Sequence, residues 1–390
     1  MPFPRIVATL AAATLVVSCG HASTSSKSSG SHKTPSAAAR QPAAKPIPPA
    51  CGDPAAVVAA LSVHDKLAQL LMVGVRDADD AQSVISAHHV GGIFIGSKTN
   101  LSMLTDGSLA DIARKAGPLP LAVSVDEEGG RVSRLSSLIG SAPSARILAQ
   151  TRSADEVYQL ALERGRKMRG LGITIDLAPV ADVSNAPDDT VIGDRSFSGD
   201  PAVVTAYAGA YARGLRDAGL LPVLKHFPGH GHGSGDSHTG TVTTPPLADL
   251  QTNDLVPYRT LVTAAPVGVM IGHMQVPGLT GNDPASLSRP AVQLLRDGTG
   301  YGAPPFNGPV ISDDVSSMAA ISDRYGVAEA VLRTLQAGSD VALWVTTDEV
   351  AAVLDRLQKA VAAGELAMPA IDASLLRMAA VKGPNVSCGH

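Results

Sequence analysis

Short apolar segments recur along the chain and alternate with longer amphipathic stretches. Eight of the apolar segments are rich in Val, Ile and Leu and predict strands: Leu70–Val75, Gly91–Ile95, Leu121–Asp126, Ile173–Ala178, Leu221–His226, Val267–His273, Pro309–Asp313 and Asp340–Val345. They are apolar at successive positions instead of alternating, which is typical of parallel strands covered on both faces. Helix-like stretches such as Pro201–Ala218 and Ala328–Ala337 lie between most of them. This order predicts an α/β fold, a single (β/α)8 TIM-like barrel, with a doubly wound open sheet as the alternative.

Charged and histidine side chains gather where the predicted strands end. These residues are Asp126 and Glu127, Asp182, Lys225 and His226, His273, Asp313 and Asp314, and, a little later, Asp348. In a barrel the carboxyl ends of all strands converge on one mouth, where active sites form. No Gly-x-Gly-x-x-Gly follows the first strand, so a dinucleotide-binding fold has no support.

The richest of these segments begins as a strand at Leu221 and continues as a glycine-rich loop to His238. It holds four of the eleven histidines, which are His226, His230, His232 and His238. A zinc site is one interpretation, although proline and glycine between the histidines exclude a helical His-x-x-x-His site. On an extended segment, residues two apart point to the same side, so Asp236 would orient the ring of His238. A solvated Asp–His pair in a flexible turn is the alternative.

Two further segments carry candidate chemistry. Asp313 and Asp314 end a strand, where one carboxylate can act as a nucleophile, and neighbours on a strand face opposite ways. Only one of the two should therefore point into the mouth, and a structural role for the pair is the alternative. The carboxylate of Asp126 and the guanidinium groups of Arg131 and Arg134 are suited to binding vicinal hydroxyl groups of a substrate. The alternative is that these residues form a salt-bridged turn. Trp344 would stack on a sugar ring or pack in the core.

The N-terminus has the pattern of a targeting segment. Arg5 precedes a twelve-residue apolar run, Ile6–Val17, which is too short to span a membrane and typical of a signal peptide. Val16–Cys19 resembles a bacterial lipobox, so residues 1–18 would be a lipoprotein signal peptide with lipid added to Cys19. An ordinary secretory signal is the alternative. Residues 19–52 are rich in Ser, Ala and Pro and predict a disordered tether, which leaves residues 53–390 as the barrel domain.

Charge and cysteine content narrow the partners and the compartment. Residues 1–52 hold five basic and no acidic side chains, so the remainder carries about nine net negative charges. That balance disfavours binding of nucleic acids, whose phosphate backbone is itself negative. If Cys19 carries lipid, Cys51 and Cys388 remain at the two ends of the folded body, in an oxidising compartment. We expect them to form a disulfide, with two free thiols as the alternative.

Taken together, these segments resemble glycoside hydrolase family three, and specifically its bacterial β-N-acetylglucosaminidase branch. The resemblance runs from about Leu61 to Gly338. It is carried by Lys225–Gly231 with Asp236–His238, by Asp126 with Glu128–Val132, and by Arg195–Phe197, Pro284–Ser288 and Ser312–Asp314.

The resemblance implies roles for individual residues. Asp313 matches the nucleophile, His238 the acid/base and Asp236 the partner that orients His238. The residues that match those holding the sugar are Asp126, Arg134, Arg195, Lys225 and His226. The resemblance gives no metal role to His230 or His232, and we expect no metal and no other cofactor. The chain ends soon after the eighth strand, so we expect no second C-terminal catalytic domain.

The activity implied is that of a retaining exo-β-N-acetylglucosaminidase with a covalent glycosyl intermediate on Asp313. The expected substrate is carbohydrate, a peptidoglycan fragment with N-acetylglucosamine on muramic acid. The expected protein is a monomer, extracytoplasmic and held at the membrane only by the lipid anchor. Three rivals stay open: a β-glycoside phosphorylase using the same residues, a non-catalytic lipoprotein that binds cell-wall sugars, and a zinc hydrolase.

Overall fold

A closed ring of parallel strands forms the centre of the structure, a computed structural model that describes residues 52–264 and 266–383. The eight strands are β1 (Leu71–Gly74), β2 (Gly92–Ile95), β3 (Ala122–Val125), β6 (Ile175–Asp176), β7 (Leu221–Phe227), β9 (Gly268–Ile271), β11 (Val310–Ser312) and β12 (Ala342–Trp344). They pair in that order, β12 pairs with β1, and a bridge between Ile311 and Val341 closes the ring. The TIM-like barrel and all eight strands are confirmed, and the open sheet is wrong.

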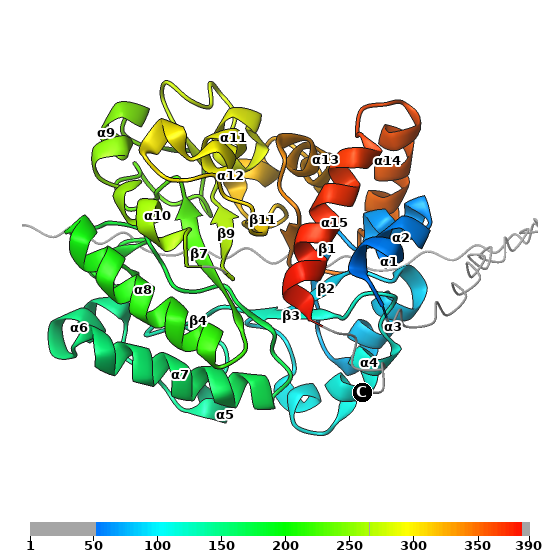
Figure 1. Ribbon diagram of the computed structural model, residues 1–390, viewed down its shortest axis with the longest axis horizontal. Helices are drawn as coiled ribbons and strands as arrows, with labels where there is room; N and C mark the ends of the chain where they lie inside the picture. The colour runs from blue at the N-terminus through cyan, green and yellow to red at the C-terminus, as the bar shows by residue number, and fades with distance from the viewer. Residues whose placement is uncertain (1–51, 265, 384–390) are drawn as a thin grey trace, which may run out of the picture. The chain divides into compact units, whose positions relative to one another are not determined.

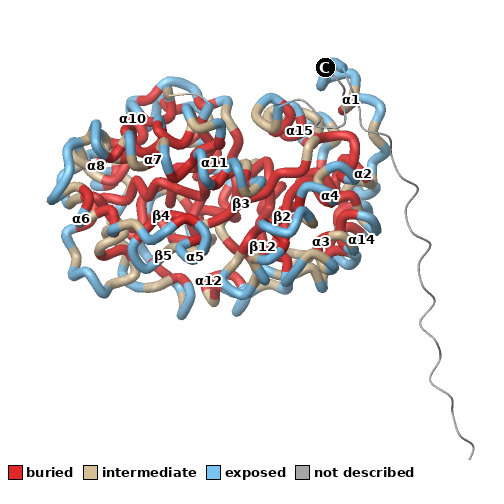
Figure 2. Tube along the Cα trace, turned by 90° about the horizontal axis from the view of Figure 1, so that it is seen from below, coloured by how far each residue is buried: buried red, intermediate tan, exposed pale blue. Residues whose placement is uncertain are grey.

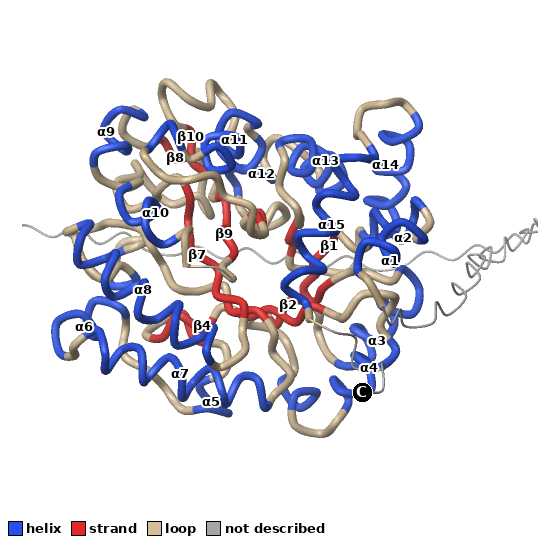
Figure 3. The backbone as a smooth tube through the Cα atoms, viewed as in Figure 1, coloured by secondary structure: helices blue, strands red, loops and turns tan. Residues whose placement is uncertain are grey.

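Helices surround the ring of strands (Figures 1 and 3). They are α1 (Pro54–Ala60), α2 (Val63–Ala68), α3 (Ala78–His88), α4 (Ser108–Lys115), α5 (Ser136–Ile139), α6 (Ala145–Thr151), α7 (Ala154–Gly170), α8 (Pro201–Asp217), α9 (Leu247–Thr252), α10 (Val256–Leu261), α11 (Arg289–Asp297), α12 (Ala319–Ser322), α13 (Val327–Ala337), α14 (Val350–Ala362) and α15 (Met368–Lys382). Two small two-stranded sheets lie outside the barrel, β4 (Glu127–Gly129) with β5 (Val132–Ser133), and β8 (Val242–Thr243) with β10 (Met274–Gln275).

Local sequence signals set where the long helices begin. Helix α7 starts with a capping box, in which the side chain of Ser153 accepts from the backbone of Glu156 and the Glu156 side chain accepts from the backbone of Ser153. Helix α8 starts with Asp200 as its N-cap and Pro201 in the first turn. The helix expected over Pro201–Ala218 therefore has nearly the predicted bounds.

Apolar side chains are buried on both faces of the sheet. In Figure 2 the trace at the barrel strands β2 and β3 has the colour of buried residues. One cluster lies between the strands and the surrounding helices. A second, smaller cluster fills the barrel interior and includes Met72, Phe94, Ala122, Ile175, Leu177, Leu221, Val223, Met270, Ile311 and Leu343. Burial on both faces is the reason that the strands are apolar at successive positions.

The alternation of side chains along each strand selects which polar residues enter the mouth. On β7, Leu221 and Val223 belong to the interior cluster, and Lys225 continues the same face one step later. On β11, Ile311 lies inside the barrel, so Asp313 continues inward. On these two strands the interior apolar face thus leads to a polar side chain at the carboxyl end.

Several sequence predictions fall outside the described residues. These are the signal peptide at residues 1–18, nearly all of the tether at 19–52, the lipid site at Cys19 and the disulfide between Cys51 and Cys388. Within the described part, no helix combines the length and the apolar character needed to cross a membrane.

Glu127 lies next to Asp126 at the end of β3, yet its side chain is fully buried and points away from the mouth. Its carboxylate accepts hydrogen bonds from the hydroxyl of Ser133 and from the backbone N–H groups of Arg134 and Leu135, the latter two at 2.8 Å. It also pairs with the buried guanidinium of Arg164 on α7. Glu127 therefore joins the β4–β5 hairpin to α7 and belongs to the scaffold.

We expect Glu127→Gln to destabilise the fold, because it leaves the buried Arg164 without a counter-charge. Breaking a buried pair by removing one partner costs about 3–5 kcal/mol. The free energy of unfolding in urea measures the loss. Glu163→Gln is the matched control, because Glu163 is exposed on α7, the helix that carries Arg164, and forms a surface ion pair with Lys167. Equal stability of the two variants would contradict the scaffold role.

Candidate active site

Two adjoining cavities open among the loops that follow the barrel strands. The larger has a volume of about 510 Å³ and the smaller about 140 Å³. Both are lined by the same five residues, Asp126, Arg134, His238, Asp313 and Met318. The expected sugar-holding residues Arg195, Lys225 and His226 line the smaller cavity. The structure therefore brings together at one mouth all of the site residues expected from the sequence except Asp236, which lies beside them.

Asp313 is half-buried in the wall shared by both cavities. Its Oδ1 accepts a hydrogen bond of 2.9 Å from the N–H of Asp314. Burial acts to raise the pKa of Asp313, but His273, His226, this hydrogen bond and Lys225 outweigh it and hold the pKa below its ordinary value. The group is therefore a carboxylate, the form in which it is nucleophilic.

The side chain of Asp314 makes different contacts from that of Asp313. Its carboxylate accepts hydrogen bonds from the backbone N–H and hydroxyl groups of Ser316 and Ser317. Its carbonyl oxygen lies 2.7 Å from Nε2 of the buried His273. Asp314 thus holds the turn after β11. The carboxylates of the two aspartates have different partners, although both residues line the larger cavity.

Asp236 and His238 form a close pair. Nδ1 of His238 lies 2.7 Å from Oδ1 of Asp236, and the same oxygen accepts the backbone N–H of His238 at 2.9 Å. Burial opposes the effect of these bonds, which nevertheless lower the pKa of Asp236. The expected pairing is confirmed, but its expected geometry is wrong. Thr239 donates to the carbonyl of Asp236, so the residues form a tight turn and not an extended segment.

The loop that carries this pair is tied down at several points. The N–H of His230 donates to Oδ1 of Asp182 at 2.7 Å, and Nδ1 of His232 lies 3.0 Å from Oδ1 of the buried Asp254. At the far end, the carbonyls of Ser237 and His238 accept from the first two N–H groups of α12. Among the described residues, no cluster of three or more His, Cys, Asp or Glu side chains could hold a metal ion. Each loop histidine instead has its own neighbour.

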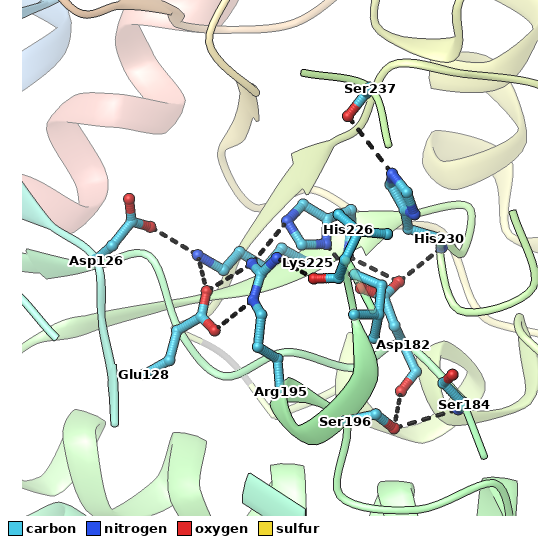
Figure 4. Close-up of polar contacts among 12 residues, drawn as sticks. Asp126, Glu128, Asp182, Ser184, Arg195, Ser196, Lys225, His226, His230 and Ser237 are labelled. Atoms are coloured by element: carbon cyan, nitrogen blue, oxygen red, sulfur yellow. Dashed lines mark hydrogen bonds and ion pairs between the residues drawn. The ribbon is translucent and has the colours of Figure 1, made fainter. Parts of the chain in front are cut away.

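A buried ion-pair cluster forms the floor of the smaller cavity (Figure 4). Nζ of Lys225 lies 2.6 Å from both Oδ1 of Asp126 and Oε1 of Glu128. Arg195 forks onto Glu128, with Nε and Nη2 each 2.8 Å from a carboxylate oxygen. Despite burial, Arg195 and Lys225 lower the pKa of Glu128, and Asp126 and Glu128 raise that of Lys225. Glu128, Arg195 and Lys225 are therefore charged, and their contacts hold them in place.

Glu128 and Asp182 are functional residues to which the sequence analysis assigned no role. Glu128 orients both cations of the smaller cavity. Asp182 is fully buried and accepts from Nδ1 of His226 at 2.7 Å, as well as from the backbone of His226 and His230. Nε2 of His226 lies 3.5 Å from Nη2 of Arg195. For Glu128, the available signal was a carboxylate two residues after an expected sugar-holding residue, as in Asp126-x-Glu128.

Arg146 and Arg134 differ in the hydrogen-bond partners of their guanidinium groups. The guanidinium of Arg146 donates to the carbonyls of Ser184, Ala186 and Gly193 and so shapes the loop that presents Arg195. Arg134 lines both cavities, and its Nε is buried with no hydrogen-bond partner within the described part of the chain. Arg134 therefore has donors left for a bound molecule.

Two aromatic or imidazole candidates belong to the scaffold. Trp344 is fully buried in the core cluster outside the strands, so it does not stack on a sugar. His273 is buried between the hydroxyl of Ser286, 2.7 Å from Nδ1, and the carbonyl of Asp314.

Comparison with known proteins identifies the family. The model of the glycosyl hydrolase family 3 N-terminal domain matches residues 62–381. Beta-hexosaminidase LpqI of Mycobacterium tuberculosis is 69% identical over 392 residues, which cover 100% of both chains. A structure of M. tuberculosis LpqI has 72% identity and a TM-score of 0.87, covering 88% of this chain and 100% of that one. A family 3 β-N-acetylglucosaminidase from Paenibacillus has 34% identity and a TM-score of 0.77, covering 83% and 62%. The chain belongs to glycosyl hydrolase family 3 and is a glycosidase.

Proposed function

We propose that the protein is a retaining exo-β-N-acetylglucosaminidase that removes the terminal, non-reducing β-linked N-acetylglucosamine of a carbohydrate substrate. One observation carries the proposal. An ionised carboxylate, Asp313, and a histidine held by an aspartate, His238, line the same wall shared by two cavities. The relatives named beta-hexosaminidase and β-N-acetylglucosaminidase support the choice of sugar.

In the first chemical step, the Asp313 carboxylate attacks the anomeric carbon while His238 donates a proton to the departing glycosidic oxygen. The product is a glycosyl ester on Asp313 and a free leaving alcohol. In the second step, neutral His238 takes a proton from water, which attacks the same carbon and releases Asp313. Two inversions give net retention. Asp236 contacts Nδ1 of His238, which leaves Nε2 as the nitrogen that exchanges the proton.

The smaller cavity holds the sugar that is transferred. Lys225 and Asp126 present fixed polar groups to hydroxyls, as do Arg195 and His226 beside them. Arg134 adds a guanidinium with free donors. Because Glu128 and Asp182 hold these groups before substrate arrives, little reorganisation accompanies binding.

The proposal also covers the substrate, the oligomeric state and the location of the protein. The substrate would be a peptidoglycan fragment with N-acetylglucosamine on muramic acid. The protein would act as a monomer outside the cytoplasm, with residues 1–18 as signal peptide, lipid on Cys19 and residues 19–52 as tether. The relative's name, LpqI, is consistent with a lipoprotein. A disulfide between Cys51 and Cys388 is supported by the packing of α1 against α15, since Cys51 closely precedes α1 and Cys388 closely follows α15.

Two alternative functions, a protein that only binds sugars and a phosphorylase, have different outcomes. Because the chain is a glycosidase, a purely sugar-binding role falls away. Phosphorolysis stays as a second candidate, since a neutral histidine, unlike a carboxylate, does not repel phosphate. In addition, Nε of Arg134 has no hydrogen-bond partner among the described residues.

We expect Asp313→Asn to lower kcat on an aryl β-N-acetylglucosaminide by about 10⁴-fold or more, because no covalent intermediate can form. Steady-state absorbance assays measure the loss. Asp323→Asn, an exposed aspartate just beyond α12, is the matched control and should retain wild-type kcat. Activity of the Asp313 variant within tenfold of wild type would refute its assignment as nucleophile.

We expect His238→Ala to depend strongly on the leaving group. On a disaccharide, kcat/KM should fall by about 10²–10⁴-fold, because the departing alkoxide needs a proton. On a dinitrophenyl glycoside the fall should be far smaller, because that leaving group departs without protonation. Parallel measurement of kcat/KM on the two substrates gives the ratio. The same loss on both would assign His238 to binding or folding instead.

We expect turnover to be hydrolytic. The rate of sugar release should be the same with and without inorganic phosphate, and free N-acetylglucosamine should be the product by mass spectrometry. A phosphate-dependent rate together with N-acetylglucosamine-1-phosphate would establish the phosphorylase instead.

A further inference from the structure

The acid/base loop, residues 229–240, contains two histidines that have no part in the proposed chemical steps. His230 is buried, and its backbone N–H donates to Asp182. The side chain of His232 contacts a different segment, the turn between α9 and α10 that carries Asp254. Neither His232 nor Asp254 lines either cavity of the mouth. His232 thus joins the loop that carries His238 to a part of the barrel outside the site.

His232 and Asp254 form an ion pair near the start of the loop. Nδ1 of His232 lies 3.0 Å from Oδ1 and 3.1 Å from Oδ2 of Asp254. The hydrogen bond to Asp254 raises the pKa of His232 against the effect of burial, and the charge of Asp182 acts in the same direction. Burial raises the pKa of Asp254, and His232 opposes that rise. The imidazolium form of His232 is therefore favoured by the carboxylates that face it.

Asp254 depends on this contact more than His232 does. The side chain of Asp254 is 2% exposed, whereas that of His232 is 32% exposed. No other cation forms an ion pair with Asp254 within the described part of the chain. A buried carboxylate that loses its only counter-charge is strongly unfavourable. The pair therefore resists separation of the loop from the turn between α9 and α10.

The backbone on either side of His232 already lies against the barrel. A Cβ atom at Gly229, whose φ is +131°, would lie 2.5 Å from Cβ of Asp254. A Cβ atom at Gly231 would collide with the carbonyl oxygen of Val183. Only glycine permits such close approach of the backbone. The start of the loop thus packs directly on the body of the barrel, and His232 fastens it there.

Beyond His232 the loop is held mainly by its own residues. Among the described residues, the hydrogen bonds of residues 233–236 all stay within residues 230–243. Contact with another element returns where the carbonyls of Ser237 and His238 accept N–H groups of α12, at 3.1 and 3.4 Å. The stretch that presents the acid/base side chain is therefore fixed at two places, by the ion pair of His232 and by α12.

We propose that His232 is a positioning residue, whose ion pair with Asp254 holds the acid/base loop where His238 reaches the departing glycosidic oxygen. The proposal rests on the glycosidase function proposed above, in which His238 transfers the proton. Because His232 lines neither cavity, it acts through the loop and not on the substrate. A misplacement of about 1 Å caused by a change far from the chemistry can lower a rate by about 10²-fold.

The first test measures kcat/KM of His232→Ala on a disaccharide and on a dinitrophenyl β-N-acetylglucosaminide. On the disaccharide we expect a fall of about 10- to 100-fold, because the departing alkoxide needs the proton of a well-placed His238. On the dinitrophenyl glycoside the fall should be less than about threefold, because that leaving group needs no proton. His232→Asn should recover part of the loss, because its Nδ2 takes the place of the imidazole Nδ1 and donates to Asp254.

His89→Ala is the matched control. Nδ1 of His89 lies 2.9 Å from Oδ1 of Asp65, so this variant also removes a histidine from a histidine–aspartate pair, but neither residue lines a cavity of the mouth. It should lower the free energy of unfolding in urea and keep the wild-type ratio of kcat/KM for the two substrates. A His232→Ala variant that behaves like this control, losing stability with an unchanged ratio, would show that its role is structural only.

The second test asks whether His232 acts through His238. When His232→Ala is added to His238→Ala, kcat/KM on the disaccharide should fall by less than about twofold further, because the group that His232 positions is already gone. Losses that add in the double variant would overturn the positioning role. If His238→Ala itself loses equally on both substrates, the acid/base assignment in the proposed function is wrong, and the role of His232 falls with it.

Discussion

The buried contact of Glu128 with Lys225 and Arg195 is the constraint on which the mouth of the barrel depends. It joins the hairpin after β3, the end of β7 and the loop after β6, three segments that are distant in sequence. Charges removed from water must be paired closely to be tolerated, so the three side chains have little freedom. A polar surface of fixed shape results, with Asp126 and His226 set against it.

The proposed acid/base side chain is held in a different way. His238 is exposed, and its loop is fastened through Asp182, Asp254 and the backbone of α12. These attachments are hydrogen bonds at the edges of a glycine-rich segment, with little apolar burial behind Asp236 and His238. Such segments open at lower free energy than core strands. The smaller cavity, which is proposed to hold the sugar, thus has rigid walls, whereas the proposed proton-transfer group lies on the more easily opened side.

Much of the architecture was predictable because it follows from repeating local patterns. Apolar runs of strand length predicted all eight strands, and the polar residues after them predicted the mouth. Asp236 and His238 were expected to pair, but through an extended segment; a side-chain-to-backbone turn produces the contact instead. Glu127 stood among the expected mouth residues and belongs to the scaffold. Its role depends on Arg164, which no local pattern connects to it.

The sequence by itself determined the barrel, the gathering of polar residues at its mouth and the family, because these follow from side-chain period and from motifs of neighbouring residues. Only the tertiary structure decided which carboxylates pair with which cations, and that the mouth contains two adjoining cavities. Glu128, Asp182 and Asp254 each act on a partner from another segment. Pairing over such distances is set by which loops the closed barrel brings together, and that information exists only once the ring of strands has formed.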